Sequence, residues 1–269
     1  MKRDLKKGIW FAAVPGKTTL EKFQAAKDAG FAGVELQSHL DQDEIVRARD
    51  ETGVTVATVA CRHDARALSH PNPARRAEAV EGIKHALRDA KRYGATSILV
   101  VPRGLDEKTS YAENYERLQS GLKDAVPLAE ELGVKLAFEN VWNHFILSPL
   151  EAARFVDEFK SPAVGWHFDV GNMIFLGWPE QWIRILGKRI AKLHIKEYSR
   201  KKLNEHGLRA GFAVEYLEGD NDWPAVMKAL DEIGYTGWAT AEPAWKPEGV
   251  EPAVRLKQIS EKLGKIFAL

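Results

Sequence analysis

Four residues with metal-binding side chains stand at or near the ends of four apolar segments in the second half of the chain. The segments are 135–138, followed by Glu139; 164–168, followed by Asp169; 190–195, which contains His194; and 238–241, followed by Glu242. Short apolar runs separated by amphipathic stretches predict buried parallel strands, whose carboxyl ends all open on one rim of a barrel. Three carboxylates and one imidazole meeting there suit Mn²⁺, Mg²⁺, Co²⁺ or Zn²⁺. Without a cation the three carboxylates would repel one another.

The rest of the chain predicts the framework that would bring these residues together. Earlier apolar runs occupy 8–14, 33–37, 54–60 and 97–101. Helical patterns occupy 19–29, 41–52, 73–93, 111–132, 149–159, 179–186, 223–233 and 252–267. Eight strand–helix units in a chain of this length predict one (β/α)₈ TIM barrel over residues 1–269, with the metal site at the C-terminal rim of the strands. A doubly wound open sheet is the alternative, but its dinucleotide and phosphate-loop motifs are missing from the sequence.

Composition and charge exclude several classes of protein. Lys+Arg 39 against Asp+Glu 38 leaves a formal charge of +1, so we expect no nucleic-acid partner, which would demand a basic excess. Cys61 is the only cysteine, which excludes an intramolecular disulfide and a multi-cysteine metal site. The apolar run 9–14 is shorter than a signal-peptide core and ends at Pro15, and no run reaches the ~18 residues of a membrane span. We therefore expect a cytoplasmic protein with no membrane partner.

Polar residues close to the predicted ligands are candidates for substrate binding. Side chains alternate along a strand, so Lys196 shares the strand face of His194, and His167 shares that of Asp169. Glu35, at the end of the second run, could orient a ligand or a substrate hydroxyl. The alternative for each is a structural hydrogen bond or ion pair.

Loop residues after the predicted strands form a second group of candidates. Arg62 and His63 follow the third run, and Arg103 follows the fourth. Trp142 and Trp245 follow two of the ligand-bearing strands, where an aromatic wall could pack against the apolar face of a ligand. Solvated loop charges and the packing of loops on the barrel are the structural alternatives.

Five segments together resemble the xylose-isomerase-like sugar phosphate isomerase/epimerase family. They are 31–36, 136–140, 168–172, 193–196 and 218–223, and they keep the family's order along nearly the whole chain. The resemblance implies a (β/α)₈ barrel with one divalent metal ion held by Glu139, Asp169, His194 and Glu242. In the ketose 3-epimerases of this family the two glutamates also move the proton, which makes Glu139 and Glu242 the expected catalytic acid/base pair.

The chain also departs from the tagatose-type ketose 3-epimerases. Asn172 stands three residues after the metal aspartate, where those enzymes usually carry histidine, and is a candidate substrate contact. The glutamate usual after the strand-five ligand is missing from 140–145, and Leu217 replaces the first glycine of a Gly-x-Gly motif. Arg200 matches the family's substrate-binding arginine, six residues after the metal histidine. These departures leave the identity of the sugar open.

The resemblance and the predicted metal site lead to one expected reaction. We expect a small-molecule sugar or sugar phosphate as substrate and 3-epimerisation of a ketose through an enediolate, with Glu139 and Glu242 transferring the proton. Aldose–ketose isomerisation, or a lyase reaction on an oxidised sugar, would use the same chemistry. Abasic-site cleavage and sugar binding without catalysis are more distant alternatives. The closing helix at 252–267 offers a surface for a homo-oligomer.

Overall fold

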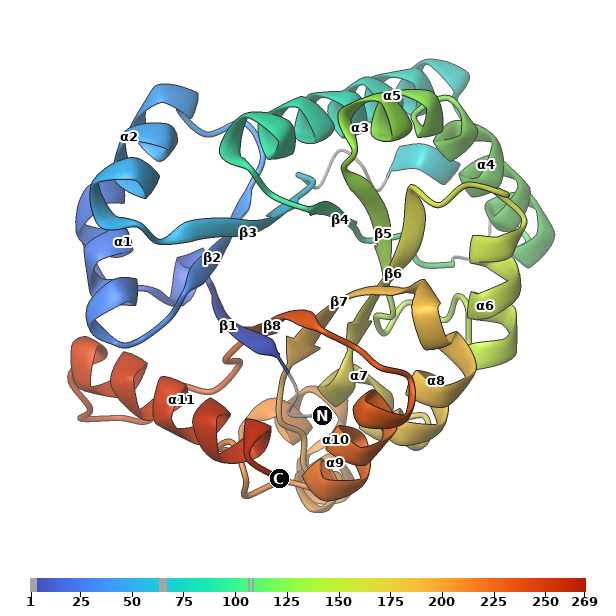
Figure 1. The fold of residues 1–269 in the computed structure, drawn as a ribbon. Coiled ribbons are helices and arrows are strands. Elements are labelled where there is room, and N and C mark those ends of the chain that lie inside the picture. Colours follow the sequence, from blue (N-terminus) through green and yellow to red (C-terminus); the bar gives the residue numbers. More distant parts are fainter. Residues whose placement is uncertain (1–3, 63–66, 106, 108) are drawn as a thin grey trace.

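The structure, a computed structural model, describes residues 4–62, 67–105, 107 and 109–269 and contains a closed barrel of eight parallel strands (Figure 1). The strands pair in chain order, and β8 pairs with β1 to close the barrel. They are β1 (Leu5–Trp10), β2 (Gly33–Gln37), β3 (Thr55–Ala60), β4 (Ser97–Val100), β5 (Lys135–Glu139), β6 (Val164–Asp169), β7 (Ile190–Ile195) and β8 (Gly237–Ala241). The predicted TIM barrel is confirmed, and the open-sheet alternative is wrong.

Eleven α-helices lie within the described residues, and most of them surround the barrel and cover the outer face of the strands (Figure 1). They are α1 (Thr19–Asp28), α2 (Gln42–Thr52), α3 (Pro73–Tyr93), α4 (Tyr111–Lys123), α5 (Val126–Leu132), α6 (Pro149–Asp157), α7 (Val170–Ile174), α8 (Pro179–Leu186), α9 (Arg200–His206), α10 (Trp223–Glu232) and α11 (Pro252–Phe267). Short 3₁₀ segments include η1 (Phe11–Ala13), η3 (Gly187–Arg189) and η4 (Leu208–Phe212). Within the described ranges, no helix is long and apolar enough to cross a membrane.

Local sequence explains where many of these helices begin. The side chains of Thr18 and Ser110 each accept a backbone N–H in the first turn of the following helix. In turn, the side chains of Glu21 and Glu113 accept the backbone N–H of Thr18 and of Ser110. These reciprocal bonds satisfy donors that the first turn of a helix leaves open. Proline occupies the first turn of six helices, where its missing N–H costs nothing.

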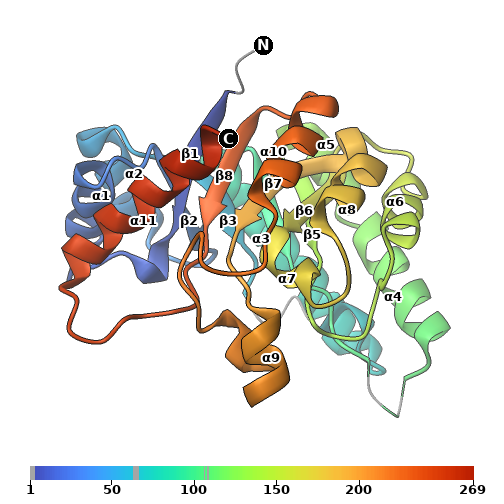
Figure 2. The same cartoon turned by 90° about the horizontal axis from the view of Figure 1, so that it is seen from below.

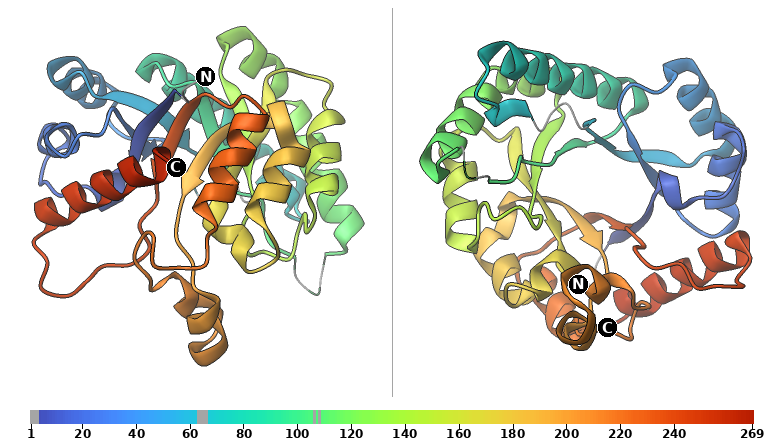
Figure 3. Two further views of the ribbon diagram at one scale, coloured as in Figure 1. Left: turned by 60° about the horizontal axis from the view of Figure 1, so that its bottom comes forward. Right: turned by 180° about the vertical axis from the view of Figure 1, so that it is seen from behind.

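Three features differ from the elements predicted for the chain. The first strand begins at Leu5 and ends at Trp10, because residues 5–9 pair with β8 and residues 11–13 turn into η1. The predicted helix over 111–132 is two helices, and Pro127 lies in the first turn of the second one, where it is tolerated. The third feature is α9, which projects from the C-terminal rim after β7 (Figures 2 and 3).

The inside of the barrel is unusually polar beneath its C-terminal rim. Glu35, His167 and Lys192 are all fully buried there, with Thr58 beside them. Lys192 Nζ lies 3.3 Å from Glu35 Oε2 and donates a hydrogen bond to Thr58 Oγ1. Branched apolar side chains usually fill this part of a TIM barrel, and burying charges there is costly unless they are paired. This paired polar layer forms the floor of the site described next.

Candidate active site

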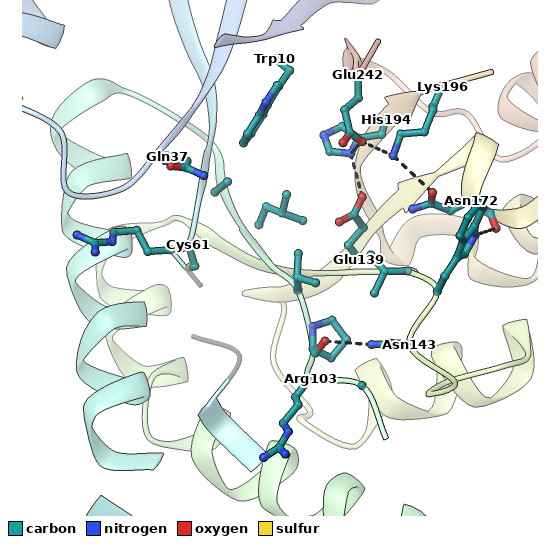
Figure 4. A pocket seen from close by; sticks show the side chains of 18 of the residues that line it. Trp10, Gln37, Cys61, Arg103, Glu139, Asn143, Asn172, His194, Lys196 and Glu242 are labelled. Atoms are coloured by element: carbon teal, nitrogen blue, oxygen red, sulfur yellow. Dashed lines mark hydrogen bonds and ion pairs between the residues drawn. The ribbon is translucent and has the colours of Figure 1, made fainter. Parts of the chain in front are cut away.

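The four predicted metal ligands meet at the C-terminal rim of the barrel. Glu139 ends β5, Asp169 ends β6, His194 lies in β7, and Glu242 directly follows β8. Their ligand atoms all lie within 4.8 Å of one another. His194 Nδ1 is 3.0 Å from Glu139 Oε1, 3.3 Å from Glu242 Oε2 and 3.8 Å from Asp169 Oδ2. Figure 4 shows Glu139, His194 and Glu242 close together. We call these four residues the inner cluster.

Strand register explains why the inner cluster is compact. Asp169 pairs with His194 across β6 and β7, and His194 pairs with Thr240 across β7 and β8. Glu139 pairs with His167, two residues before Asp169 on the same face of β6. The ligands therefore point inward from four adjacent strands at nearly the same height.

The donor set of the inner cluster fits a divalent cation. Asp169 and His194 are completely or almost completely buried, and three carboxylates in such a place require positive charge. Lys196 supplies some of it, since its Nζ lies 2.9 Å from Asp169 Oδ2 and 2.5 Å from Glu242 Oε2. The inner cluster, which already lies beside the Lys196 ammonium, offers three carboxylates and one imidazole nitrogen. This is a suitable ligand set for an ion such as Mn²⁺ or Zn²⁺.

The three carboxyl groups of the inner cluster have pKa values shifted in opposite directions from their ordinary values. Burial raises the pKa of Glu139 to about 7, although the neighbouring His194 opposes this shift. Burial also raises the pKa of Asp169, against the opposing charge of Lys196. For Glu242, burial is outweighed by Lys196 and His194, which together leave its pKa well below the ordinary value. Of the two glutamates, Glu139 is thus the one that exchanges a proton more readily near neutral pH in the metal-free protein.

Glu35 holds His194 from below the inner cluster. Its Oε1 lies 2.6 Å from His194 Nε2, so the ring presents Nδ1 to the three carboxylates. Burial by itself would raise the pKa of Glu35. The interactions with His194, Lys192 and His167 outweigh burial, so the pKa lies well below its ordinary value and the carboxyl is ionised. The hypothesis that Glu35 orients a ligand is consistent with this contact.

A cavity of about 700 Å³ opens beside the inner cluster (Figure 4). A volume of this order accommodates a small organic ligand such as a sugar. Of the candidates for substrate binding, the residues that line this cavity are Arg62, Arg103, Trp142, Asn172 and Lys196. The guanidinium of Arg103, however, points away from Glu139 and His194 in Figure 4.

Aromatic side chains form one wall of the cavity next to Asn172. The Trp142 ring stacks on Phe212 with centroids 4.3 Å apart and meets Tyr198 edge-on at 5.3 Å. Trp142 Nε1 donates to the backbone carbonyl of Asn172 at 3.0 Å, which fixes the indole. Such a wall can pack against the apolar face of a sugar ring.

Several lining residues were not predicted from the sequence. Trp10, Gln37, Asn143 and Phe212 all line the cavity. Trp10 and Gln37 end β1 and β2, so the rule that the active site lies at strand ends could have identified them. Phe212 lies in η4, far along the excursion after β7, and no periodic pattern points to it.

Three of the predicted substrate contacts do not line the cavity. His167 is fully buried in the polar layer, because β6 turns it inward below Asp169. Arg200 binds backbone carbonyls, with Nε 3.2 Å from Ile174 O and Nη2 3.0 Å from Gly177 O, so it ties α9 to the loop after α7. Trp245 is not among the residues lining the cavity, and the guanidinium of Arg255 lies over its ring. His63 falls outside the described residues.

Fold and site together define a (β/α)₈ barrel with a carboxylate-rich, histidine-containing centre at its C-terminal rim. The chain belongs to the xylose isomerase-like TIM barrel family, whose model matches residues 23–263. The resemblance found in the sequence is therefore confirmed.

Two curated relatives illustrate the range of the family. L-ribulose-5-phosphate 3-epimerase UlaE of Escherichia coli O1:K1 / APEC is 26% identical over 265 residues, which cover 93% of this chain and 90% of the relative. Inosose dehydratase of Clostridium perfringens (strain 13 / Type A) is 26% identical over 152 residues, or 52% of this chain. That second match spans only half of the dehydratase, 50% of its length.

Solved structures share the fold over almost the full chain. The apo form of 3-keto-D-glucoside 4-epimerase YcjR from E. coli superposes with a TM-score of 0.84 at 20% identity, covering 99% of this chain and 100% of that one. D-psicose 3-epimerase, whose crystal structure was determined in the presence of D-fructose, superposes with a TM-score of 0.80 at 18% identity, covering 97% of each chain. At these identities the likeness concerns the fold.

Proposed function

We propose that this protein is a divalent-metal-dependent sugar epimerase or isomerase, and that its reaction is the 3-epimerisation of a ketose or ketose phosphate. The observation that carries the proposal is the convergence of Glu139 and Glu242 with Asp169 on Nδ1 of His194, beside a cavity of sugar size. These four residues would hold the ion, which when bound supplies Lewis-acid polarisation of the substrate carbonyl. The ion could be Mn²⁺, Mg²⁺, Co²⁺ or Zn²⁺.

Glu139 and Glu242 are the proposed acid/base pair. They reach the inner cluster from β5 and β8, with β6 and β7 between them. One glutamate takes the proton from the carbon next to the carbonyl and leaves a planar enediolate, and the other returns a proton to the opposite face. A Glu139 pKa of about 7 in the metal-free protein suits a group that must both accept and release a proton.

Lys196, Asn172 and Trp142 are the proposed substrate contacts. Lys196 Nζ lies between the inner cluster and the Phe212 ring, 5.1 Å from its centroid, and lines the cavity. From there its ammonium can donate to a negatively charged substrate oxygen. Asn172 offers an amide on the same side, and Trp142 offers an apolar face.

A lyase reaction on an oxidised sugar is the second candidate. Lys196 Nζ lies 2.5 Å from Glu242 Oε2, which places a proton donor next to a carboxylate base. After a glutamate removes the proton beside the carbonyl, a hydroxyl on the next carbon could leave as water once Lys196 protonates it. The partial match to inosose dehydratase supports keeping this candidate.

Solvent-deuterium exchange tests the proposal. The metal-stripped protein is incubated in D₂O with a panel of free and phosphorylated ketoses and one oxidised cyclitol, with each ion and with chelator. Metal-dependent deuterium at C3 together with the 3-epimer supports epimerisation. Deuterium in an aldose product indicates the isomerase, and loss of water indicates the lyase. If no compound on the panel acquires deuterium with any of the ions, the proposed enzyme class is wrong.

A further inference from the structure

A second group of potential metal ligands lies outside the barrel, between α3 and the loop that joins β2 to α2. His39 belongs to the loop, and His85 and Asp89 lie one turn apart on α3. Each offers a ligand atom, and the three atoms lie within 4.8 Å of one another. None of the three lines the cavity beside the inner cluster. We call them the outer cluster.

Asp89 is a fully buried carboxylate with little positive charge near it. Its Oδ1 accepts Gln42 Nε2 at 2.6 Å, and its Oδ2 accepts the backbone N–H of His39 at 2.9 Å. Both donors are neutral. Among the described residues its one ion-pair contact is with His85 Nε2, at 3.4 Å, and an imidazole is charged only when protonated. Because a buried carboxylate is costly without a charged partner, this position favours a bound cation.

Two of the three ligand atoms already have the separation that a metal ion requires. Ligands bonded to tetrahedral Zn²⁺ at ~2.0–2.1 Å lie about 3.3–3.4 Å apart, and His85 Nε2 is 3.4 Å from Asp89 Oδ2. The i, i+4 spacing on α3 produces this arrangement, since it places the two side chains on one helix face.

His39 is held next to this pair by an uncommon backbone conformation. Its φ is +65°, in the left-handed region, and its N–H is bound to Asp89. Its ring stacks on that of His85, with centroids 4.0 Å apart and planes 18° apart. Near-parallel rings do not aim their nitrogens at one point, so binding an ion requires one ring to tilt. The exposure of His39 and of the His85 side chain, 43%, leaves room for this rotation.

We propose that the outer cluster is a second cation site, which binds a borderline divalent ion such as Zn²⁺, Co²⁺ or Ni²⁺ through His39, His85 and Asp89. Two imidazoles and one carboxylate suit these ions, and water can complete the coordination sphere at the exposed side. The ion links the β2–α2 loop to α3. Gln37, two residues before His39, lines the cavity, so the ion anchors the segment behind one cavity wall. Binding to the folded state alone also stabilises the protein.

Calorimetric titration of the metal-stripped, full-length protein with Zn²⁺ tests the proposal. We expect two equivalents in the wild type and one in His85→Gln. His39→Asn should also bind one, since asparagine tolerates a left-handed φ but lacks the imidazole. His206→Gln removes an exposed histidine at the end of α9 and should retain two equivalents. Wild-type stoichiometry in both cluster variants, or a single equivalent in the wild type, overturns the proposal.

Two further readouts separate this site from the inner cluster and from misfolding. In His194→Gln, which disables the inner cluster, Zn²⁺ should still raise the midpoint of thermal unfolding, and adding His85→Gln should abolish the increase. After chelator treatment, His85→Gln and the wild type should unfold at similar temperatures, which shows that the substitution by itself does not disturb the fold. If Zn²⁺ still raises the unfolding midpoint of the double variant, the ion binds elsewhere and the proposal is wrong. None of these results depends on which sugar the protein converts.

Discussion

His194 Nε2 and Glu35 Oε1 lie 2.6 Å apart, although 159 positions separate the two residues in the sequence. The contact joins β7 to β2 across the interior of the barrel and turns His194 Nδ1 toward the three carboxylates. A carboxylate that accepts the second N–H of a metal-binding histidine fixes its tautomer and makes it a better ligand. Lys192, 3.3 Å from the other Glu35 oxygen, keeps that carboxylate in place.

Glu35→Gln should weaken binding of the divalent ion at the inner cluster by about 10–100-fold, the usual effect of removing such a partner. The amide keeps the shape of the side chain but loses the charge that orients His194. Calorimetric titration with Mn²⁺ measures the affinity, and ¹⁵N shifts of the His194 ring report its tautomer. The matched control is Glu51→Gln, an exposed glutamate in α2. Equal affinities for Glu35→Gln and the control would show that the contact is merely structural.

Gly171→Ala should displace the end of β7, which carries His194, together with Lys196 directly after it. A Cβ at position 171 would lie 2.7 Å from the carbonyl oxygen of Lys196 and 2.9 Å from its carbonyl carbon, and backbone atoms cannot move aside cheaply. We expect a loss of about 1–3 kcal/mol in the free energy of unfolding and weaker metal binding. Gly177→Ala is the control, since its Cβ would meet nothing within 4 Å. Similar denaturation midpoints for the two variants would contradict the prediction.

Glu139→Gln and Glu242→Gln should each lower turnover by about 10²–10⁴-fold, since an amide cannot accept the proton that a general base removes. Each loss should persist at ion concentrations that saturate the variant, which separates proton transfer from weakened metal binding. Glu131→Gln on the outer helix α5 provides the control. Unchanged turnover in both inner-cluster variants would falsify the acid/base assignment.

Affinity for the divalent ion should fall as the pH drops below about 7. In the metal-free protein burial raises the Glu139 pKa to about 7, so below this pH a proton occupies the carboxylate that the ion needs. Releasing one proton on binding changes affinity by about ten-fold per pH unit below the pKa, with little change above it. Titrations between pH 5.5 and 8.5 measure the slope, and Glu139→Gln should flatten it. A slope unaltered by that substitution would assign the proton to another group.

The barrel and the convergence of the four inner-cluster residues could be predicted because both depend on local patterns. Apolar runs alternating with amphipathic stretches indicate parallel strands covered by helices, and closure of such strands brings their carboxyl ends to one rim. Glu139, Asp169 and Glu242 each directly follow a run, and His194 lies within one. Their convergence therefore needs no knowledge of the loops.

Tertiary structure alone decided which other side chains meet at the rim and which do not. Phe212 reaches Trp142 through the excursion after β7, while Arg200 turns back to bind the carbonyls of Ile174 and Gly177. The outer cluster likewise joins a loop to a helix more than 40 positions away. Periodicity describes the elements of a barrel, but the path of a loop depends on contacts between residues distant in the chain. For this reason the sequence determined the fold and the four residues of the inner cluster, and the folded chain determined the lining of the cavity, the support of His194 and the outer cluster.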